Sequence, residues 1–121
     1  MWNPQVRFSS ANIAALKKSL RDNYPHIKSS HFDEAIAASI GFNSYAAMRP
    51  VLVQVGNYAR LIVIADHMLL LLRLEELGYR DIDAGDLRHL MWDIKFPDRW
   101  YDNQLDEAVS KRRRPVAANS H

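Results

Sequence analysis

The stretch Lys28–Arg49, KSSHFDEAIAASIGFNSYAAMR, constrains the fold more than any other part of the chain. Ser30 and Asp33 follow the S/T-x-x-D/E order of an N-terminal capping box, in which each side chain satisfies an exposed amide. Small apolar residues then continue to Ile40, and Gly41 stands where helices commonly end in a left-handed residue. The stretch therefore predicts a short helix that ends in a tight glycine turn.

The residues after this glycine predict how the chain continues. Phe42 is placed to fold back onto the helix that precedes it, as apolar residues after a glycine stop commonly do. Asn43 or Ser44 is placed to cap a second helix that begins at Tyr45. We therefore expect a helix–Gly turn–helix unit at this point of the chain.

Caps and apolar periodicity predict further helices on both sides of this unit. The segment Trp2–Phe8 is expected to be irregular, because Pro4 interrupts regular structure. The helix that follows Asp66 is apolar on most sides, so we expect it to be the most deeply buried one. The further helices run from Ser9 or Ser10 to Asn23, from His67 to Leu77, from Asp83 or Gly85 to Ile94, and from Asp98 to Val109.

Two interpretations of residues 50–64 stay open. In the first, the second helix runs through Pro50 to Val55, and Leu61–Ile64 is a lone extended run. In the second, the β-branched residues on either side of Gly56-Asn57 form a hairpin. The first is favoured, because both strands of such a hairpin would lack a polar face.

Together these elements predict an all-α fold, a small bundle of about five to six helices with room for one short β-hairpin. Residues 1–110 are expected to form the single helical domain, and residues 111–121 a basic disordered tail. The expected core consists of Leu16, Leu20, Ile36, Ile40, Phe42, Leu61, Val63, Leu69, Leu72, Leu90 and Trp92.

The composition excludes several classes of protein. There is no cysteine, which removes disulfides, thiolate metal sites and cysteine nucleophiles. The first residues contain no apolar run typical of a secretory signal, so we expect a cytoplasmic protein. The longest apolar stretch, Leu61–Leu74, contains Asp66, His67 and Arg73 and is too short and too polar to span a bilayer. No membrane partner is expected.

Two motifs in the chain carry a resemblance to a known group of proteins. Residues 10–80 resemble a small helical domain of uncharacterised, often plasmid-borne bacterial proteins that are loosely labelled glyoxalase-related. The resemblance transfers no activity, because glyoxalase chemistry needs a metal held in a paired βαβββ scaffold, and that strand pattern is absent. The first motif matches at Ser30, His31, Ala35, Ala37, Gly41, Phe42 and Tyr45, and the second at Asp66, Arg73, Leu74, Leu77, Gly78 and Tyr79.

The sequence shows no catalytic or metal-binding signature. There is no glycine-rich phosphate loop, and no serine is placed as a nucleophile beside a base. We therefore predict no catalytic residue, no metal and no cofactor. No pair at the i, i+4 spacing of helical metal ligands occurs among His26, His31, His67, His89 and His121.

The helix–Gly turn–helix unit also fits the outline of a DNA-binding helix-turn-helix. Asn43 and Arg49 are then the candidate base-reading residues, although Pro50 falls within the recognition helix. The candidate phosphate contacts are Lys111, Arg112, Arg113 and Arg114. Without these four charges the chain, with a formal charge of +2, would be slightly acidic, which argues against a broad basic DNA-binding face.

These observations favour a non-catalytic bacterial interaction module that binds another protein. The resemblance adds the expectation of a plasmid- or phage-encoded accessory protein, and thus of a mobile genetic element. Two alternatives stay open: a small helix-turn-helix-like DNA-binding regulator, and a fragment of a metal-dependent glyoxalase-like enzyme. The sequence gives no indication of the oligomeric state.

Overall fold

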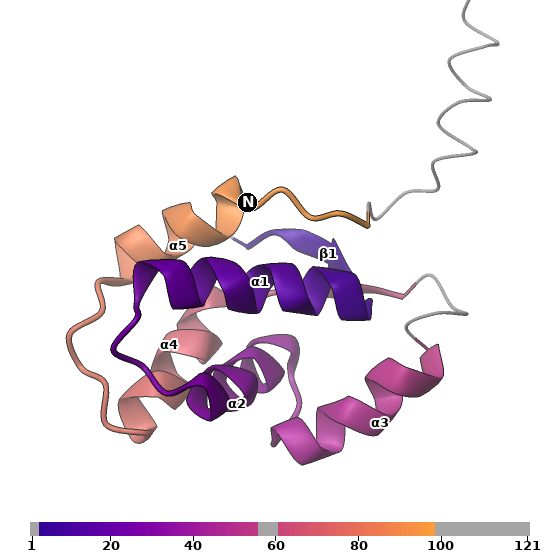
Figure 1. Cartoon of the computed structure of the whole chain (residues 1–121), viewed down its shortest axis with the longest axis horizontal. Helices are drawn as coiled ribbons and strands as arrows, with labels where there is room; N and C mark the ends of the chain where they lie inside the picture. Colours follow the sequence, from indigo (N-terminus) through magenta and orange to yellow (C-terminus); the bar gives the residue numbers. More distant parts are fainter. Residues whose placement is uncertain (1–2, 56–60, 99–121) are drawn as a thin grey trace, which may run out of the picture.

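Helices dominate the part of the chain that the computed structural model describes, residues 3–55 and 61–98 (Figure 1). The all-α prediction is confirmed, with a small β component added. Within these residues the elements are β1 (Gln5–Arg7), α1 (Ser10–Asn23), α2 (Ser29–Ile40), α3 (Tyr45–Val55), β2 (Ile62–Ile64), α4 (His67–Glu76) and α5 (Ala84–Asp93).

Side-chain caps begin most of the helices where the sequence places them. Each cap accepts a hydrogen bond from an amide in the first turn, which otherwise has no partner within the helix. The four predicted starts are therefore confirmed. The bonds run from the Asn12 amide to Ser9 Oγ (3.2 Å), from the Ala47 amide to Ser44 Oγ (3.1 Å), from the Met68 amide to Asp66 Oδ1 (2.9 Å) and from the Asp86 amide to Asp83 Oδ2 (2.9 Å).

Glycine ends α2, as predicted. Gly41 has φ +103°, in the left-handed region that other residues rarely adopt, and the Phe42 amide donates to the Ala37 carbonyl at 2.9 Å. The same arrangement follows α4, where Gly78 has φ +104° and the next amide bonds back into the helix. The helix–Gly turn–helix unit of α2 and α3 is thus present.

The predicted capping box of α2 is wrong. The helix starts at Ser29, and its N-cap is Lys28, which makes no side-chain capping bond. Asp33 therefore lies more than one turn into the helix, too far from the cap to reach back. Its carboxylate instead pairs with Lys17 of α1, at 2.8 Å.

A two-stranded antiparallel sheet joins distant parts of the chain. Gln5 pairs with Ile64, and Arg7 pairs with Ile62. The expectation that Trp2–Phe8 is irregular is therefore wrong for Gln5–Arg7, and the extended run at 62–64 has a partner strand instead of standing alone. The predicted hairpin across Gly56-Asn57 does not form, because residues 51–55, its first strand, belong to α3. Helix α3 continues through Pro50 to Val55, as the favoured interpretation predicts.

The core lies around α2, which contacts α1, α3, α4 and β2 (Figure 1). The expectation that α4 is the most buried helix is therefore wrong: α4 packs mainly against α2 and α5, and one side of it is uncovered. The largest fully buried apolar side chains are Phe8, Leu16, Leu20, Phe32, Ile36, Met48, Leu70, Leu74, Leu87 and Met91.

Several residues of the expected core lie elsewhere. Ile40, Phe42, Val63 and Leu90 are partly buried at the edge of the core. Four large apolar side chains that were expected inside are exposed: Leu61, Leu69, Leu72 and Trp92. The predicted helix Asp98–Val109 lies, apart from Asp98, outside the described residues, as does the tail 111–121. Within the described residues there is no helix long and apolar enough to cross a membrane.

Candidate functional site

The outer side of α4 carries a row of exposed apolar residues. His67, Leu70, Leu71 and Leu74 are buried, and their spacing of three and four residues marks the side that packs inward. Met68, Leu69 and Leu72 lie on the remaining surface and are 43%, 42% and 50% exposed. A run of leucines on a helix that is covered on one side only therefore leaves an apolar surface facing solvent, as binding surfaces do.

An open hollow adjoins this row, where α4 meets the turn between α2 and α3. Its volume is about 320 Å³. The lining combines apolar side chains, which we call the floor, with polar groups, which we call the rim, and such a mixture is usual for a site that accepts a side chain of another molecule. The residues that line it are Ala38, Gly41, Phe42, Asn43, Leu69, Leu72, Arg73 and Glu76.

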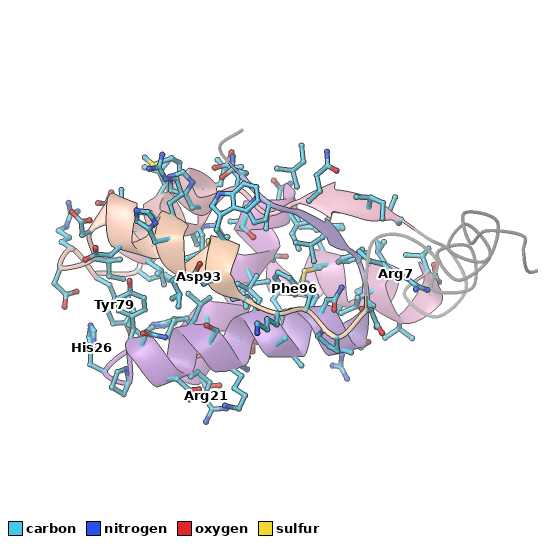
Figure 2. The ribbon with its side chains drawn as sticks, turned by 90° about the horizontal axis from the view of Figure 1, so that it is seen from above. Arg7, Arg21, His26, Tyr79, Asp93 and Phe96 are labelled. Carbon is cyan, nitrogen blue, oxygen red and sulfur yellow. The ribbon has the colours of Figure 1, made fainter. Side chains whose placement is uncertain are left out.

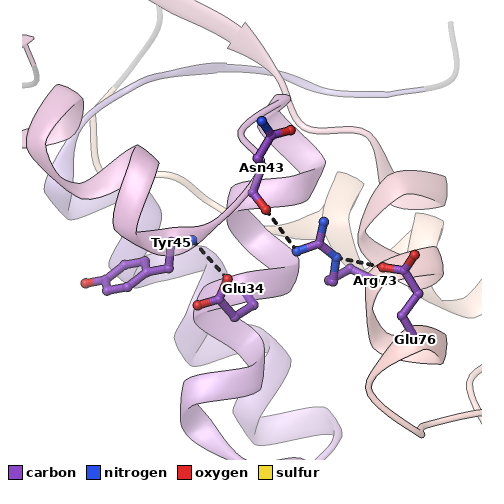
Figure 3. A network of polar contacts seen from close by, with 5 residues as sticks. All are labelled: Glu34, Asn43, Tyr45, Arg73 and Glu76. Carbon is purple, nitrogen blue, oxygen red and sulfur yellow. Dashed lines mark hydrogen bonds and ion pairs between the residues drawn. The ribbon is translucent and has the colours of Figure 1, made fainter.

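Polar contacts fix the rim of the hollow (Figure 3). Arg73 of α4 donates from Nη1 to the Asn43 carbonyl at 3.2 Å, and its Nε pairs with Glu76 at 2.8 Å. On the other side of the turn, Glu34 of α2 accepts from the Tyr45 amide at 3.0 Å. The α2–α3 turn is therefore held to both α2 and α4, so that the hollow is formed before any ligand arrives.

The two candidate base-reading residues belong to different elements. Asn43 lies in the α2–α3 turn, at the rim of the hollow, and Arg49 is exposed on α3. The other exposed residues of α3 add no charge to Arg49; they are Ala46, Ala47, Pro50, Val53 and Gln54. The surface of α3 is thus almost uncharged. The remaining candidates, Lys111, Arg112, Arg113 and Arg114, lie outside the described residues.

A cluster of ring side chains joins the start of α2 to the end of α4. The Tyr79 hydroxyl accepts from the Lys28 amide at 3.2 Å and lies 2.8 Å from His31 Nδ1. His26 pairs with Asp81 at 3.1 Å and stands edge-on to the Tyr79 ring (Figure 2). Lys28 offers no side-chain cap to α2, and these contacts tie the residues before that helix to the end of α4.

The remaining titratable groups form no metal site within the described residues, where no three His, Asp or Glu side chains gather to hold an ion. His67 bonds to the side chain of Asn3, at 2.8 Å between Nδ1 and Oδ1. Burial, and secondarily the charges of Asp86, Asp83 and Asp81, raise the pKa of Tyr24. None of these groups adjoins the hollow.

Sequence reasoning missed the hollow because it assigned Phe42, Leu69 and Leu72 to the core. One signal was available: α4 has no polar side along most of its length. Because a helix in a small bundle seldom has neighbours on every side, some of its apolar residues had to be exposed. Arg73 and Glu76 carried no signal, since charges at a helix end are usually solvated.

Comparison of the chain with family models, with curated proteins and with solved structures finds no match.

Proposed function

We propose that this protein is a non-catalytic interaction module that binds another protein through the hollow on α4. The observation that carries the proposal is the exposure of Leu69 and Leu72 in the lining of a hollow whose rim is already fixed by Arg73. A preformed apolar site with a polar rim binds without the free-energy cost of ordering its own side chains.

The chemistry of the hollow defines the kind of partner. Its apolar floor suits the side chains of an amphipathic helix, which places anchors at i, i+3 or i+4 and i+7 into such grooves. Glu76 pairs with Arg73, but its side chain is 70% exposed, so its carboxylate can also accept from a basic residue beside those anchors. Covering the exposed half of one leucine contributes only about 1 kcal/mol. Several anchors are therefore needed, and we expect a Kd in the micromolar range or weaker.

Selection from a random peptide library displayed on phage tests this proposal. The full chain should enrich peptides that share apolar anchors at helical spacing together with a basic residue. A Leu69→Ser, Leu72→Ser double variant should lose their binding. Val53→Ser is the matched control, because Val53 is exposed on α3 and is not part of the hollow. Enrichment of no common sequence, or equal binding by the double variant, would refute the proposal.

A DNA-binding regulator is the second candidate, favoured by the presence of the α2–Gly41–α3 unit with Arg49 exposed on its second helix. If Lys111–Arg114 make four phosphate contacts, a plot of the logarithm of the affinity against the logarithm of the salt concentration should have a slope of about −3.6. Deleting the chain after Ser110 would then flatten the slope, and Arg49→Ala would reduce discrimination between sequences by about 1–3 kcal/mol. No binding to a mixed duplex at low salt would remove this candidate.

The metal-dependent enzyme fragment is supported by the resemblance alone, as is the origin from a plasmid or phage. The described residues gather no donor set for an ion. We therefore rank both binding functions above it.

A further inference from the structure

The hydrogen-bond register of the small sheet fixes which backbone groups point outward. The Phe8 amide donates to the Leu61 carbonyl at 2.7 Å, and the Ala65 amide donates to the Pro4 carbonyl at 3.1 Å. Hydrogen-bonded and non-hydrogen-bonded pairs alternate along an antiparallel ladder. The amides and carbonyls of Ile62 and Ile64 therefore point away from β1, toward the other edge of β2.

Among residues 3–55 and 61–98 this edge of β2 has no neighbouring strand. Within the described residues the sheet contains only β1 and β2, and no further helix or strand is drawn beyond β2 in Figure 2, where it lies at the upper margin. The edge of β1 is in part occupied, since the Arg7 carbonyl accepts from Asn12 Nδ2 at 2.9 Å. Ile64 is 55% exposed beside that edge of β2. The donors and acceptors of Ile62 and Ile64 have no backbone partner in the described part of the chain, so they can pair with a strand of another chain.

The sequence of β2 does nothing to discourage such pairing. Ile62, Val63 and Ile64 are all β-branched, and the strand has no charge, proline or bulge of the kind that protects natural edge strands. The sheet consists of two three-residue strands and packs against α2, so a strand added at β2 would extend it beyond the part that the core supports.

The strand is complementary to itself. Antiparallel pairing about Val63 sets Ile62 opposite Ile64 of the second copy, and both residues carry outward backbone groups. They would exchange both N–H···O bonds, with identical isoleucine pairs on the outer face. A two-fold axis through the Val63 pair relates the two copies, so each copy makes the same contacts and the interface is closed and isologous.

We propose that two copies of this chain pair through the edge of β2 that faces away from β1 and form one continuous sheet in the order β1–β2–β2–β1. The occupant of the edge is a second copy because the register and the side chains of Ile62–Ile64 match themselves. This interface uses the backbone of β2 and not the hollow on α4, so it goes beyond the proposed function.

The oligomeric state of the full chain, measured by sedimentation over a range of concentrations, tests the inference. A species of twice 14.0 kDa is expected, and the Ile62 and Ile64 amides should be protected from hydrogen exchange in it and not in the monomer. Ile64→Pro removes an outward donor in each copy without affecting the β1–β2 ladder. With two hydrogen bonds lost, the dimer should be about 30-fold weaker.

Ile64→Thr is the matched control, because it keeps the amide and a β-branched side chain and should retain the dimer. A single 14.0 kDa species at about 1 mM would overturn the inference. So would a dimer that Ile64→Pro leaves intact, or one whose Ile62 and Ile64 amides exchange freely. If Ile64→Pro fails to fold, the exchange measurement on the unaltered chain decides alone. The outcome does not depend on peptide binding at the hollow.

Discussion

Asn12 offers the sharpest test of how this fold is held together. Its side chain is fully buried, and it connects the end of β1 to the segment that follows α5. Nδ2 donates to the carbonyls of Arg7 and Asp98, at 2.9 and 2.6 Å, and Oδ1 accepts from the Asp98 amide at 2.9 Å. Replacing Asn12 by alanine removes all of these bonds at once.

The expected loss of stability follows from these bonds. Each contributes a net 0.5–1.5 kcal/mol, roughly, and a buried group left without a partner adds a further penalty. Because the Asp98 groups are only partly buried, water can replace some of the lost bonds. We therefore expect Asn12→Ala to lower the free energy of unfolding by about 2–3 kcal/mol, which moves the urea midpoint by about 1–2 M.

Urea denaturation followed by circular dichroism measures this loss. Asn23→Ala is the control, since Asn23 is exposed and its side chain bonds only to the Ser19 carbonyl in the last turn of α1. It should change stability by less than about 0.5 kcal/mol. An Asn12→Ala variant as stable as the control would show that the chain after α5 is not held by this residue.

Gly41→Val should lower the free energy of unfolding by more than about 1 kcal/mol, because a β-branched residue resists φ +103°. An unchanged urea midpoint would contradict this. Leu71→Ala should lower the free energy of unfolding by about 2–5 kcal/mol, because Leu71 is buried, whereas Leu72→Ala should lower it by under about 1 kcal/mol, because Leu72 is half exposed. Equal losses in the two variants would contradict the packing of α4. The raised pKa of Tyr24 means that the unfolded tyrosine ionises first as pH rises. Stability should therefore fall above about pH 10, and urea titrations should find a smaller fall in Tyr24→Phe.

The helix ends were predictable because the signals that set them are local. Ser9, Asp66 and Asp83 each accept a bond from an amide two or three residues away, and Gly41 turns the chain by its own backbone freedom. Such features need no knowledge of the rest of the fold. The capping box was wrong because α2 starts at Ser29, one residue before Ser30, so Asp33 lies too far along the helix to reach the cap and pairs with Lys17 of α1.

Strands and burial were not predictable in the same way. Gln5–Arg7 becomes a strand only because Ile62–Ile64 lies beside it. Likewise, nothing in the leucine run of α4 tells which side meets α2, so Leu69 and Leu72 look like Leu70 and Leu71 until the neighbours are known. The candidate site consists of such residues, which explains why the sequence directed attention to Asn43 and Arg49 instead.

The contacts of β1 also set the order in which this protein can fold during its synthesis. The partner strand of β1 follows α3, and the side-chain amide of Asn12 bonds to a residue 86 positions later. The N-terminal strand therefore leaves the ribosome long before anything can pair with it, and closing so long a loop carries an entropic cost. The α2–α3 unit can assemble early, but the first strand must wait as an unpaired segment. A premature stop before Ile62 would leave β1 without its partner strand and open to aggregation.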